Sequence, residues 1–288
     1  MAYKSLTDCF TLSNGVKIPC VGFGTWQTPD GEVARVAIKA ALDAGYRHID
    51  GAAVYGNEHS IGEALTAYGL PREELFITSK LVNRVRGYEE TKVALKKSLK
   101  DFQVDYLDLY LIHWPCPKEF RDRWAYWNSE SWRAFEDMLD EGLIRALGVS
   151  NFHAHHIDAI LETARIRPMV NQIRLCPSDT QPEVVKATTE RGMLLEAYSP
   201  FGGSGPANLL KDPIISEIAS KHGKTTAQVC VRWCLQRGFL PLPKSATPSR
   251  IADNTKVFDF ELDSGDIDRL NALTGYESPF PHPDRTTW

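Results

Sequence analysis

The stretch GYRHIDGAAVYGNE, residues 45–58, combines a helix end, a short buried strand and a loop that carries a single tyrosine. Gly45 is the kind of residue that ends a helix. The apolar strand that follows ends on Asp50, and Tyr55 then stands in a loop of small residues. An unpaired buried carboxylate is costly. Asp50 therefore requires a partner, and the strands that follow in the chain supply candidates for it.

A unit of short apolar strand, polar loop and amphipathic helix repeats along the chain. Strands are expected at residues 21–25, 46–50, 75–80, 106–113, 144–150, 169–173, 194–199 and 239–244. Helices are expected at residues 32–44, 60–68, 89–102, 131–141, 155–164, 182–190, 226–237 and 249–257. Strands that alternate with helices pair in parallel. About eight such units without a linker predict one (β/α)8 TIM barrel of the α/β class over residues 1–288. A doubly wound open sheet is the alternative.

Three kinds of segment lie outside this repeat. Asn14-Gly15 between alternating apolar and polar residues predicts an N-terminal β-hairpin over residues 10–20. Two extra helices are expected at residues 214–222 and 264–273. The proline-rich tail, residues 274–288, is expected near the mouth of the active site, where its aromatic residues would limit substrate size.

The composition is that of an ordinary globular protein, with 43% hydrophobic residues, 24% charged residues and a net charge of -4. This balance, without a cluster of basic residues, argues against nucleic acid or an anionic membrane as partner. The sequence has no apolar run long enough to span a bilayer, and we expect no secretory signal, because the N-terminal residues lack an apolar stretch. We expect a cytoplasmic protein, a monomer by default, whose six cysteines are core residues and not metal ligands.

Polar residues end strands that are otherwise apolar, and in barrels the active site forms at these ends. The strand-end residues are Asp50, Lys80, His113, Ser150-Asn151, Asn171-Gln172, Tyr198-Ser199 and Lys244-Ser245. Asp50, Lys80 and His113 end successive strands and should converge. A purely structural ion pair between Asp50 and Lys80, beside a core histidine, is the alternative to a catalytic group.

Tyr55 favours the catalytic interpretation. A tyrosine with a pKa of about 10 is a poor acid near neutrality. An adjacent ammonium lowers the pKa of the phenol, and a carboxylate behind the lysine positions that ammonium. Asp50, Lys80 and Tyr55 together could therefore exchange a proton with a substrate oxygen.

Eight short motifs, in order and at matching spacing, resemble those of the aldo-keto reductase family, and in particular its small bacterial NADPH-dependent carbonyl reductases. They are GFGTW (22–26), HIDGAAVYGNE (48–58), SK (79–80), LIHWP (111–115), GVSNF (148–152), NQ (171–172), AYSPFG (197–202) and PKSATPSRIADN (243–254). The resemblance implies an oxidoreductase that transfers a hydride between NADP(H) and an aldehyde or ketone, or an alcohol in reverse. It implies that Tyr55 is the general acid and base. Lys80 and Asp50 would tune Tyr55, and His113 would orient the carbonyl.

The cofactor site is expected in the loops after strands seven and eight, which bind phosphate in many barrels. Residues 22–27 lack the third glycine of a Rossmann fingerprint. Lys244 and Arg250 could be solvated charges at a helix start, but with the resemblance they favour NADPH and weaker NADH binding. The implied cofactor-binding residues are Thr25, Trp26, Asp50, Ser150, Asn151, Gln172, Tyr198, Ser199, Pro200, Phe201, Gly202, Lys244, Ser245, Ala246, Thr247, Arg250 and Asn254.

Within this set the resemblance implies particular contacts. Ser150, Asn151 and Gln172 would hold the carboxamide, Tyr198 would stack on the nicotinamide ring, and Asn254 would contact the adenine. No metal is expected.

The substrate pocket is expected to be aromatic. Its expected members are Trp26, Tyr55, His113 and Trp114, with some of Trp124, Tyr126 and Trp127 from the loop after the fourth strand, and with Phe280 and Trp288 of the tail over the mouth. Trp132, on an expected helix, is assigned to the core. Arg121 and Arg123 are interpreted as solvent-facing charges, with attraction of an anionic substrate as the alternative.

The chain departs from the family pattern at a few positions. Gly51 replaces a hydroxyl residue, and Asp253 replaces a glutamate. Arg174, Leu175 and Cys176 stand where a glutamate and then a histidine are usual. We expect these departures to change the nearby pocket wall and to leave the four implied catalytic residues intact.

Two other function classes compete with a carbonyl reductase. A nucleotide-binding regulatory barrel without turnover would not need the complete set of Asp50, Tyr55, Lys80 and His113. A barrel hydrolase or lyase is disfavoured because the sequence has no clustered metal ligands. The histidines at positions 153, 155 and 156 are expected at a solvent-facing helix start, and not as such a cluster.

Overall fold

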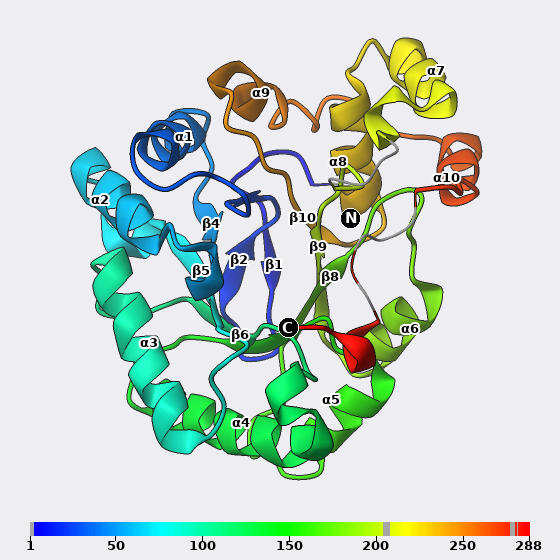
Figure 1. The fold of residues 1–288 in the computed structure, drawn as a ribbon. Helices are drawn as coiled ribbons and strands as arrows, with labels where there is room; N and C mark the ends of the chain where they lie inside the picture. Colours follow the sequence, from blue (N-terminus) through cyan, green and yellow to red (C-terminus); the bar gives the residue numbers. More distant parts are fainter. Residues whose placement is uncertain (1–2, 204–207, 277–279, 281) are drawn as a thin grey trace.

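The structure is a computed structural model that describes residues 3–203, 208–276, 280 and 282–288 (Figure 1). Helices surround a ring of parallel strands that are neighbours in sequence order. The strands are β3 (Gly22–Gly24), β4 (His48–Asp50), β5 (Phe76–Leu81), β6 (Leu109–Ile112), β7 (Leu147–Ser150), β8 (Val170–Arg174), β9 (Leu194–Tyr198) and β10 (Leu240–Leu242). The predicted TIM barrel is confirmed, and the doubly wound sheet, whose strand order would reverse, is wrong.

The first and last strands approach each other closely enough to close most of the ring. The amide of Gly24 on β3 donates to the carbonyl oxygen of Pro243, which follows β10, over 3.0 Å. A Cβ at position 24 would lie 3.1 Å from the carbonyl oxygen of Leu242. Glycine therefore permits the two backbones to meet.

The outer layer consists of the helices that follow the strands. They are α1 (Glu32–Asp43), α2 (Glu58–Tyr68), α3 (Tyr88–Phe102), α4 (Trp124–Asp140), α5 (Ala154–Leu161), α6 (Pro182–Glu190), α8 (Thr226–Gln236) and α9 (Pro248–Asp253). The predicted extra helices are present as α7 (Pro213–His222) and α10 (Ser264–Asn271). In the described part of the chain, no helix has the length and apolar character of a membrane span.

Helix α4 begins earlier than the sequence predicted. The segment 124–130 was expected to be a loop, but it forms the first turns of α4. The Asn128 side chain anchors these turns by donating to the carbonyl oxygen of Pro115 over 2.9 Å. Further along the same helix, Trp132 is buried in the core as predicted. The aromatic residues in these first turns were interpreted as pocket residues in a loop, and the start of the helix was therefore placed too late.

The predicted hairpin closes the N-terminal end of the barrel. Strands β1 (Cys9–Thr11) and β2 (Lys17–Pro19) pair antiparallel, and Figure 1 shows them inside the outline of the helical ring. Ile18 is fully buried in a cluster that includes Leu109 and Leu240 at the barrel interior. The opposite, C-terminal end of the barrel therefore remains available for a site.

Strand register brings the polar strand ends level with one another. Asp50 on β4 pairs with Thr78 on β5. Gln172 on β8 pairs with Ser150 on β7 and with Glu196 on β9. Parallel strands expose their carboxyl ends at one edge, so these side chains gather at the same end of the barrel.

Replacing Gly62 with alanine should destabilise the protein by about 1–3 kcal/mol. A Cβ at this position of α2 would lie 2.6 Å from the carbonyl oxygens of Asp101 and Phe102, the last two residues of α3, and backbone atoms cannot move aside easily. Urea unfolding measures the change. Gly265→Ala on α10 is the control, since its Cβ would approach only a side-chain oxygen at 3.3 Å. An unchanged free energy of unfolding for Gly62→Ala would contradict this packing.

Candidate active site

A cavity of about 860 Å³ opens at the C-terminal ends of the barrel strands. Its lining contains the four expected substrate-pocket residues, Trp26, Tyr55, His113 and Trp114. It also contains ten of the expected cofactor-binding residues: Trp26, Asp50, Ser150, Asn151, Gln172, Tyr198, Ser199, Pro200, Phe201 and Lys244. Residues far apart in the sequence thus meet around one cavity.

Beneath this cavity lies a buried ion pair. The Lys80 ammonium lies 2.7 and 2.8 Å from the two carboxylate oxygens of Asp50 and 2.8 Å from the carbonyl oxygen of Gly51. Lys80 is completely buried, and burial opposes its charge, but its acidic neighbours, Asp50 first among them, together outweigh this effect and raise the pKa of Lys80. Lysine therefore remains a cation at the floor of the cavity.

Tyr55 stands above this cation. It ends the short helix η1 (Ala53–Tyr55), and its phenol oxygen lies 3.4 Å from the Lys80 nitrogen. Its ring packs between Trp26, at 4.8 Å between ring centroids, and His113, at 5.9 Å. Burial raises the pKa of Tyr55, and Lys80 only partly opposes this rise. The phenol thus holds its proton, and a cation is ready to stabilise the phenolate if that proton leaves.

His113 faces the same space as a neutral ring. Burial, followed by the nearby charges of Lys80 and Arg86, holds the pKa of His113 well below its usual range. Its Nδ1 atom has no hydrogen-bond partner among the described residues. A neutral imidazole carries one N–H, so this side chain can donate one hydrogen bond without adding charge to the cavity.

A hydrogen-bonded group of amides and hydroxyls lines the next part of the cavity. Asn151 donates to the carbonyl oxygen of His113 over 3.0 Å, and the Tyr198 hydroxyl donates to the Asn151 side chain over 2.8 Å. The Ser150 hydroxyl donates to the carbonyl oxygen of Gln172 over 2.8 Å. Asn151 has a left-handed backbone, with φ of 62°, which is uncommon outside glycine. These side chains are therefore held in fixed positions by one another.

The remaining expected cofactor-binding residues lie outside the cavity lining. Thr25 is buried, and its hydroxyl donates to the carbonyl oxygen of Asp50 over 2.8 Å. The others lie in the β9 loop or around the start and end of α9, and they are Gly202, Ser245, Ala246, Thr247, Arg250 and Asn254. Arg250 is exposed and forms no side-chain hydrogen bond or ion pair with the described residues.

Comparison with known proteins shows to which family the chain belongs. Residues 20–274 match the model of the aldo/keto reductase family. The chain belongs to the aldo/keto reductase family. It is therefore an oxidoreductase of carbonyl compounds, in a family that uses NADP(H), and nothing supports a regulatory barrel without turnover.

Related proteins align with nearly the whole length of this chain. It is 45% identical over 280 residues to a glyoxal reductase of Bacillus subtilis, covering 97% of this chain and 98% of that protein. It is 43% identical to the human aldo-keto reductase family 1 member A1, covering 92% and 89%. A Bombyx mori aldo-keto reductase solved in complex with NADP has 34% identity and a TM-score of 0.86, covering 99% and 100%.

Gly51, where this family member departs from the usual pattern, lies against an aromatic ring. A Cβ at position 51 would lie 2.8 Å from the ring of Phe102 and 3.4 Å from the carbonyl oxygen of Thr78. Phe102, at the end of α3, is fully buried in the core. A side chain at position 51 would have to displace this ring, so glycine at 51 and phenylalanine at 102 fit together.

Arg174 connects three segments around the cavity of this reductase. It is only 2% exposed, and its guanidinium contacts the Asp179 carboxylate. It also donates to the carbonyl oxygens of Gly202, over 2.8 Å, and Tyr276, over 3.1 Å. Arg174 thus ties the end of β8 to the β9 loop and to the start of the tail.

The C-terminal tail forms one wall of the cavity. Phe280 and Trp288 line it and contact Trp114, at 6.0 and 5.4 Å between ring centroids. Both aromatic residues therefore belong to the wall of the cavity. Arg121 donates to the carbonyl oxygen of Thr286. Arg121 therefore anchors the tail instead of facing solvent or attracting a substrate.

Three aromatic residues, some of which were expected in the pocket, lie elsewhere. Trp124, Tyr126 and Trp127 belong to α4 and do not line the cavity. Arg123 packs on the ring of Tyr126 at 4.2 Å. Sequence reasoning missed Val82, Asn83, Arg84, Lys118 and Glu119, which do line the cavity. They follow strands β5 and β6, and their position after strand ends was the available signal.

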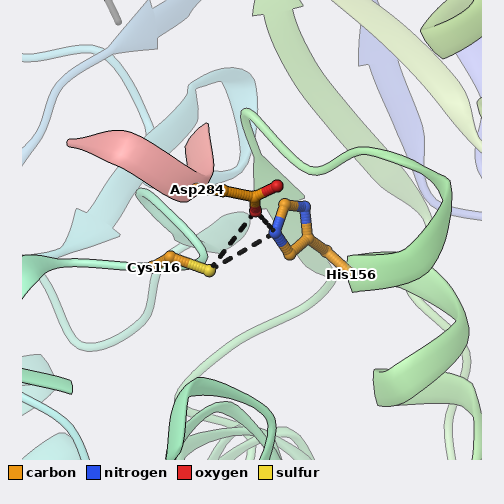
Figure 2. A group of neighbouring side chains, drawn as sticks. All are labelled: Cys116, His156 and Asp284. Carbon is orange, nitrogen blue, oxygen red and sulfur yellow. Dashed lines mark hydrogen bonds and ion pairs between the residues drawn. The ribbon is translucent and has the colours of Figure 1, made fainter. Parts of the chain in front are cut away.

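The three histidines expected to face solvent differ in exposure: His155 is exposed, as expected, whereas His156 is fully buried, so the expectation is wrong for His156. Figure 2 shows its Nε2 between the Asp284 carboxylate, at 2.7 Å, and the Cys116 sulfur, at 3.3 Å. Its Nδ1 accepts the amide of His153 over 3.1 Å. A neutral ring must then carry its proton on Nε2, where a metal would need a lone pair. The cluster is therefore a hydrogen-bonded latch for the tail.

Replacing Arg174 with methionine should lower the free energy of unfolding by roughly 2–4 kcal/mol. The change removes one member of a buried ion pair and leaves buried carbonyl oxygens without donors. Urea unfolding measures the loss, and limited proteolysis shows whether the tail is released first. Arg165→Met is the matched control, because Arg165 is 52% exposed and its surface ion pairs contribute little. Equal stability of the two variants would show that Arg174 does not hold these segments together.

Proposed function

We propose that this chain is an NADPH-dependent reductase of aldehydes and ketones that also oxidises the corresponding alcohols. The observation that carries the proposal is the position of Tyr55. Its proton-bearing phenol lies in the cavity, 3.4 Å from the ammonium of Lys80. The neutral ring of His113 stands beside it, at 5.9 Å between ring centroids. A carbonyl oxygen placed between these two side chains would meet two hydrogen-bond donors.

The residues present fit a dinucleotide cofactor. The cavity extends from Trp114 and the tail to Lys244. Gln172 has a side-chain oxygen that makes no hydrogen bond with the described residues, and Ser150 and Asn151 stand near it. A carboxamide presents both donors and acceptors to such a group. When bound, NADPH supplies the hydride for the carbonyl carbon.

The residues of the chain supply the proton and the charge stabilisation. As negative charge grows on the carbonyl oxygen, the O–H bond of Tyr55 breaks and the proton passes to that oxygen. The phenolate left behind is stabilised by Lys80, whose charge is held in place by Asp50. His113 donates a hydrogen bond to the same oxygen and orients it. Donors fixed before the reaction, in a site that excludes water, contribute strongly to the rate.

The preference for NADPH over NADH is assigned to Lys244 and Arg250. The Lys244 ammonium lies in the cavity wall, where it donates to the carbonyl oxygen of Gln27 over 3.0 Å. Arg250, on α9, is exposed and unpaired among the described residues. A 2′-phosphate binds well to such cations. A cytoplasmic location is proposed because the cysteines are free and mostly buried, as is usual in a reducing compartment.

The proposal is tested by mixing the purified protein with NADPH and a panel of aldehydes and ketones, and following NADPH absorbance. We expect carbonyl-dependent oxidation of NADPH. Tight NADPH binding without turnover of any carbonyl would contradict the proposed reaction.

Replacing Tyr55 with phenylalanine should reduce kcat by about 10²–10⁴-fold, because the proton donor is lost. The dissociation constant for NADPH should change by less than about twofold, since the ring can keep its packing. Steady-state kinetics and fluorescence titration measure the two quantities. Tyr126→Phe is the control, because that residue is 46% exposed and lies on α4. Substantial activity in Tyr55→Phe would remove this residue from the mechanism.

Replacing Arg250 with alanine should weaken NADPH binding by roughly tenfold and leave NADH binding nearly unchanged. Only NADPH carries the phosphate that Arg250 is proposed to contact. Titration of both cofactors measures the selectivity. Lys256→Ala is the control, because Lys256 is a nearby exposed cation paired with Asp253. Equal losses for NADPH and NADH would refute the phosphate contact.

A further inference from the structure

Glu196 is a carboxylic acid inside the barrel that the proposed mechanism does not use. It lies on β9, is fully buried, and pairs in register with Gln172 on β8. One of its oxygens accepts the Gln172 amide nitrogen over 2.8 Å. Its other oxygen lies 4.0 Å from the Nε2 atom of His48 and has no hydrogen bond among the described residues. A buried acid at this position requires an explanation.

Gln172 connects Glu196 to the proposed catalytic group. Its amide nitrogen donates to Glu196 and, over 2.8 Å, to the same Asp50 carboxylate that binds Lys80. Both amide protons are thereby used, so only the side-chain oxygen of Gln172 remains for a ligand. The opposite orientation would direct that oxygen at the Asp50 carboxylate, which would repel it. The two acids therefore fix Gln172 as a hydrogen-bond acceptor toward the cavity.

The charges around Glu196 leave no cation to balance a second anion. Lys80 is already paired with Asp50. Burial, followed by the charge of Lys80, lowers the pKa of His48 to about 3, so this ring is neutral. Burial, followed by the charge of Asp50, raises the pKa of Glu196 to about 8, although Gln172 and Lys80 partly oppose this. An additional unpaired charge at this depth would be costly.

We propose that Glu196 is a neutral carboxylic acid that positions Gln172 and keeps Asp50 the only anion beside Lys80. When Glu196 ionises, its proton goes to solvent and a second negative charge appears below the cavity. This negative charge raises the pKa of Lys80 and of Tyr55. Glu196 is thus a positioning residue. The neutral acid orients Gln172, and its ionisation changes the pKa of Tyr55. Its link to catalysis rests on the proposed function, but its protonation does not.

The protonation is tested by the pH dependence of unfolding, which needs no activity. The unfolded glutamate ionises near its ordinary pKa of 4.5, whereas the folded one holds its proton to about 8. Unfolding then releases one proton, so stability falls as pH rises between these values. The ratio of unfolding constants, parent to Glu196→Gln, should rise by up to about tenfold per pH unit from pH 5 to 8. Glu196→Leu should give the same slope whatever its absolute stability.

A flat ratio, or one that falls with pH, would overturn the proposal, because the folded protein would then hold Glu196 as an anion. Glu190→Gln is the control for loss of a carboxylate, since Glu190 is 61% exposed on α6. For this control we expect a ratio that changes little with pH.

The effect on catalysis is read from the pH profile of carbonyl reduction. In Glu196→Gln no second anion forms, so Tyr55 should lose its proton more easily at high pH. The alkaline limb of kcat should shift to lower pH by roughly half a unit. Superimposable profiles would overturn the link to Tyr55 even if unfolding confirms the neutral acid. If no carbonyl is reduced at all, the proposed function fails, while the unfolding test still decides the state of Glu196.

Discussion

The buried ion pair between Lys80 and Asp50 is the constraint on which the rest of the site depends. Two charges removed from water are tolerated only when their geometry is good and their remaining hydrogen bonds are satisfied. Here Lys80 has three oxygen acceptors, one of them the carbonyl of Gly51. Asp50 receives a further hydrogen bond from Gln172. The barrel strands must hold these groups in register, and Tyr55 is then placed above a fixed cation.

Electroneutrality explains the groups that surround this pair. Lys80 and Asp50 already balance each other's charge, so burial favours the neutral form of the further titratable groups that surround this pair. The pKa of His48 and of His113 is lowered, and that of Tyr55 and of Glu196 is raised, with burial as the leading cause in each case. Neutral donors and acceptors suit a reaction in which charge develops on a substrate oxygen, because they do not offset the positive charge of Lys80.

The tail illustrates how distant segments complete the cavity. Three contacts attach the tail to different parts of the barrel. They are made by Arg121, by Arg174 and by the latch between His156 and Asp284. These contacts bring Trp288 against the cavity. Arg174 donates hydrogen bonds to the carbonyl oxygens of Gly202 and Tyr276, so this wall depends on a buried guanidinium.

Sequence by itself determined the barrel, its hairpin and extra helices, and the set of polar strand ends that includes Asp50, Lys80 and His113. These follow from local periodicity and from the rule that consecutive parallel strands are neighbours. Only the tertiary structure decided which further groups are buried beside Asp50 and Lys80. The latch at Asp284 and the neutral state proposed for Glu196 depend on contacts between residues far apart in sequence, and on the absence of water around them, neither of which a local pattern encodes.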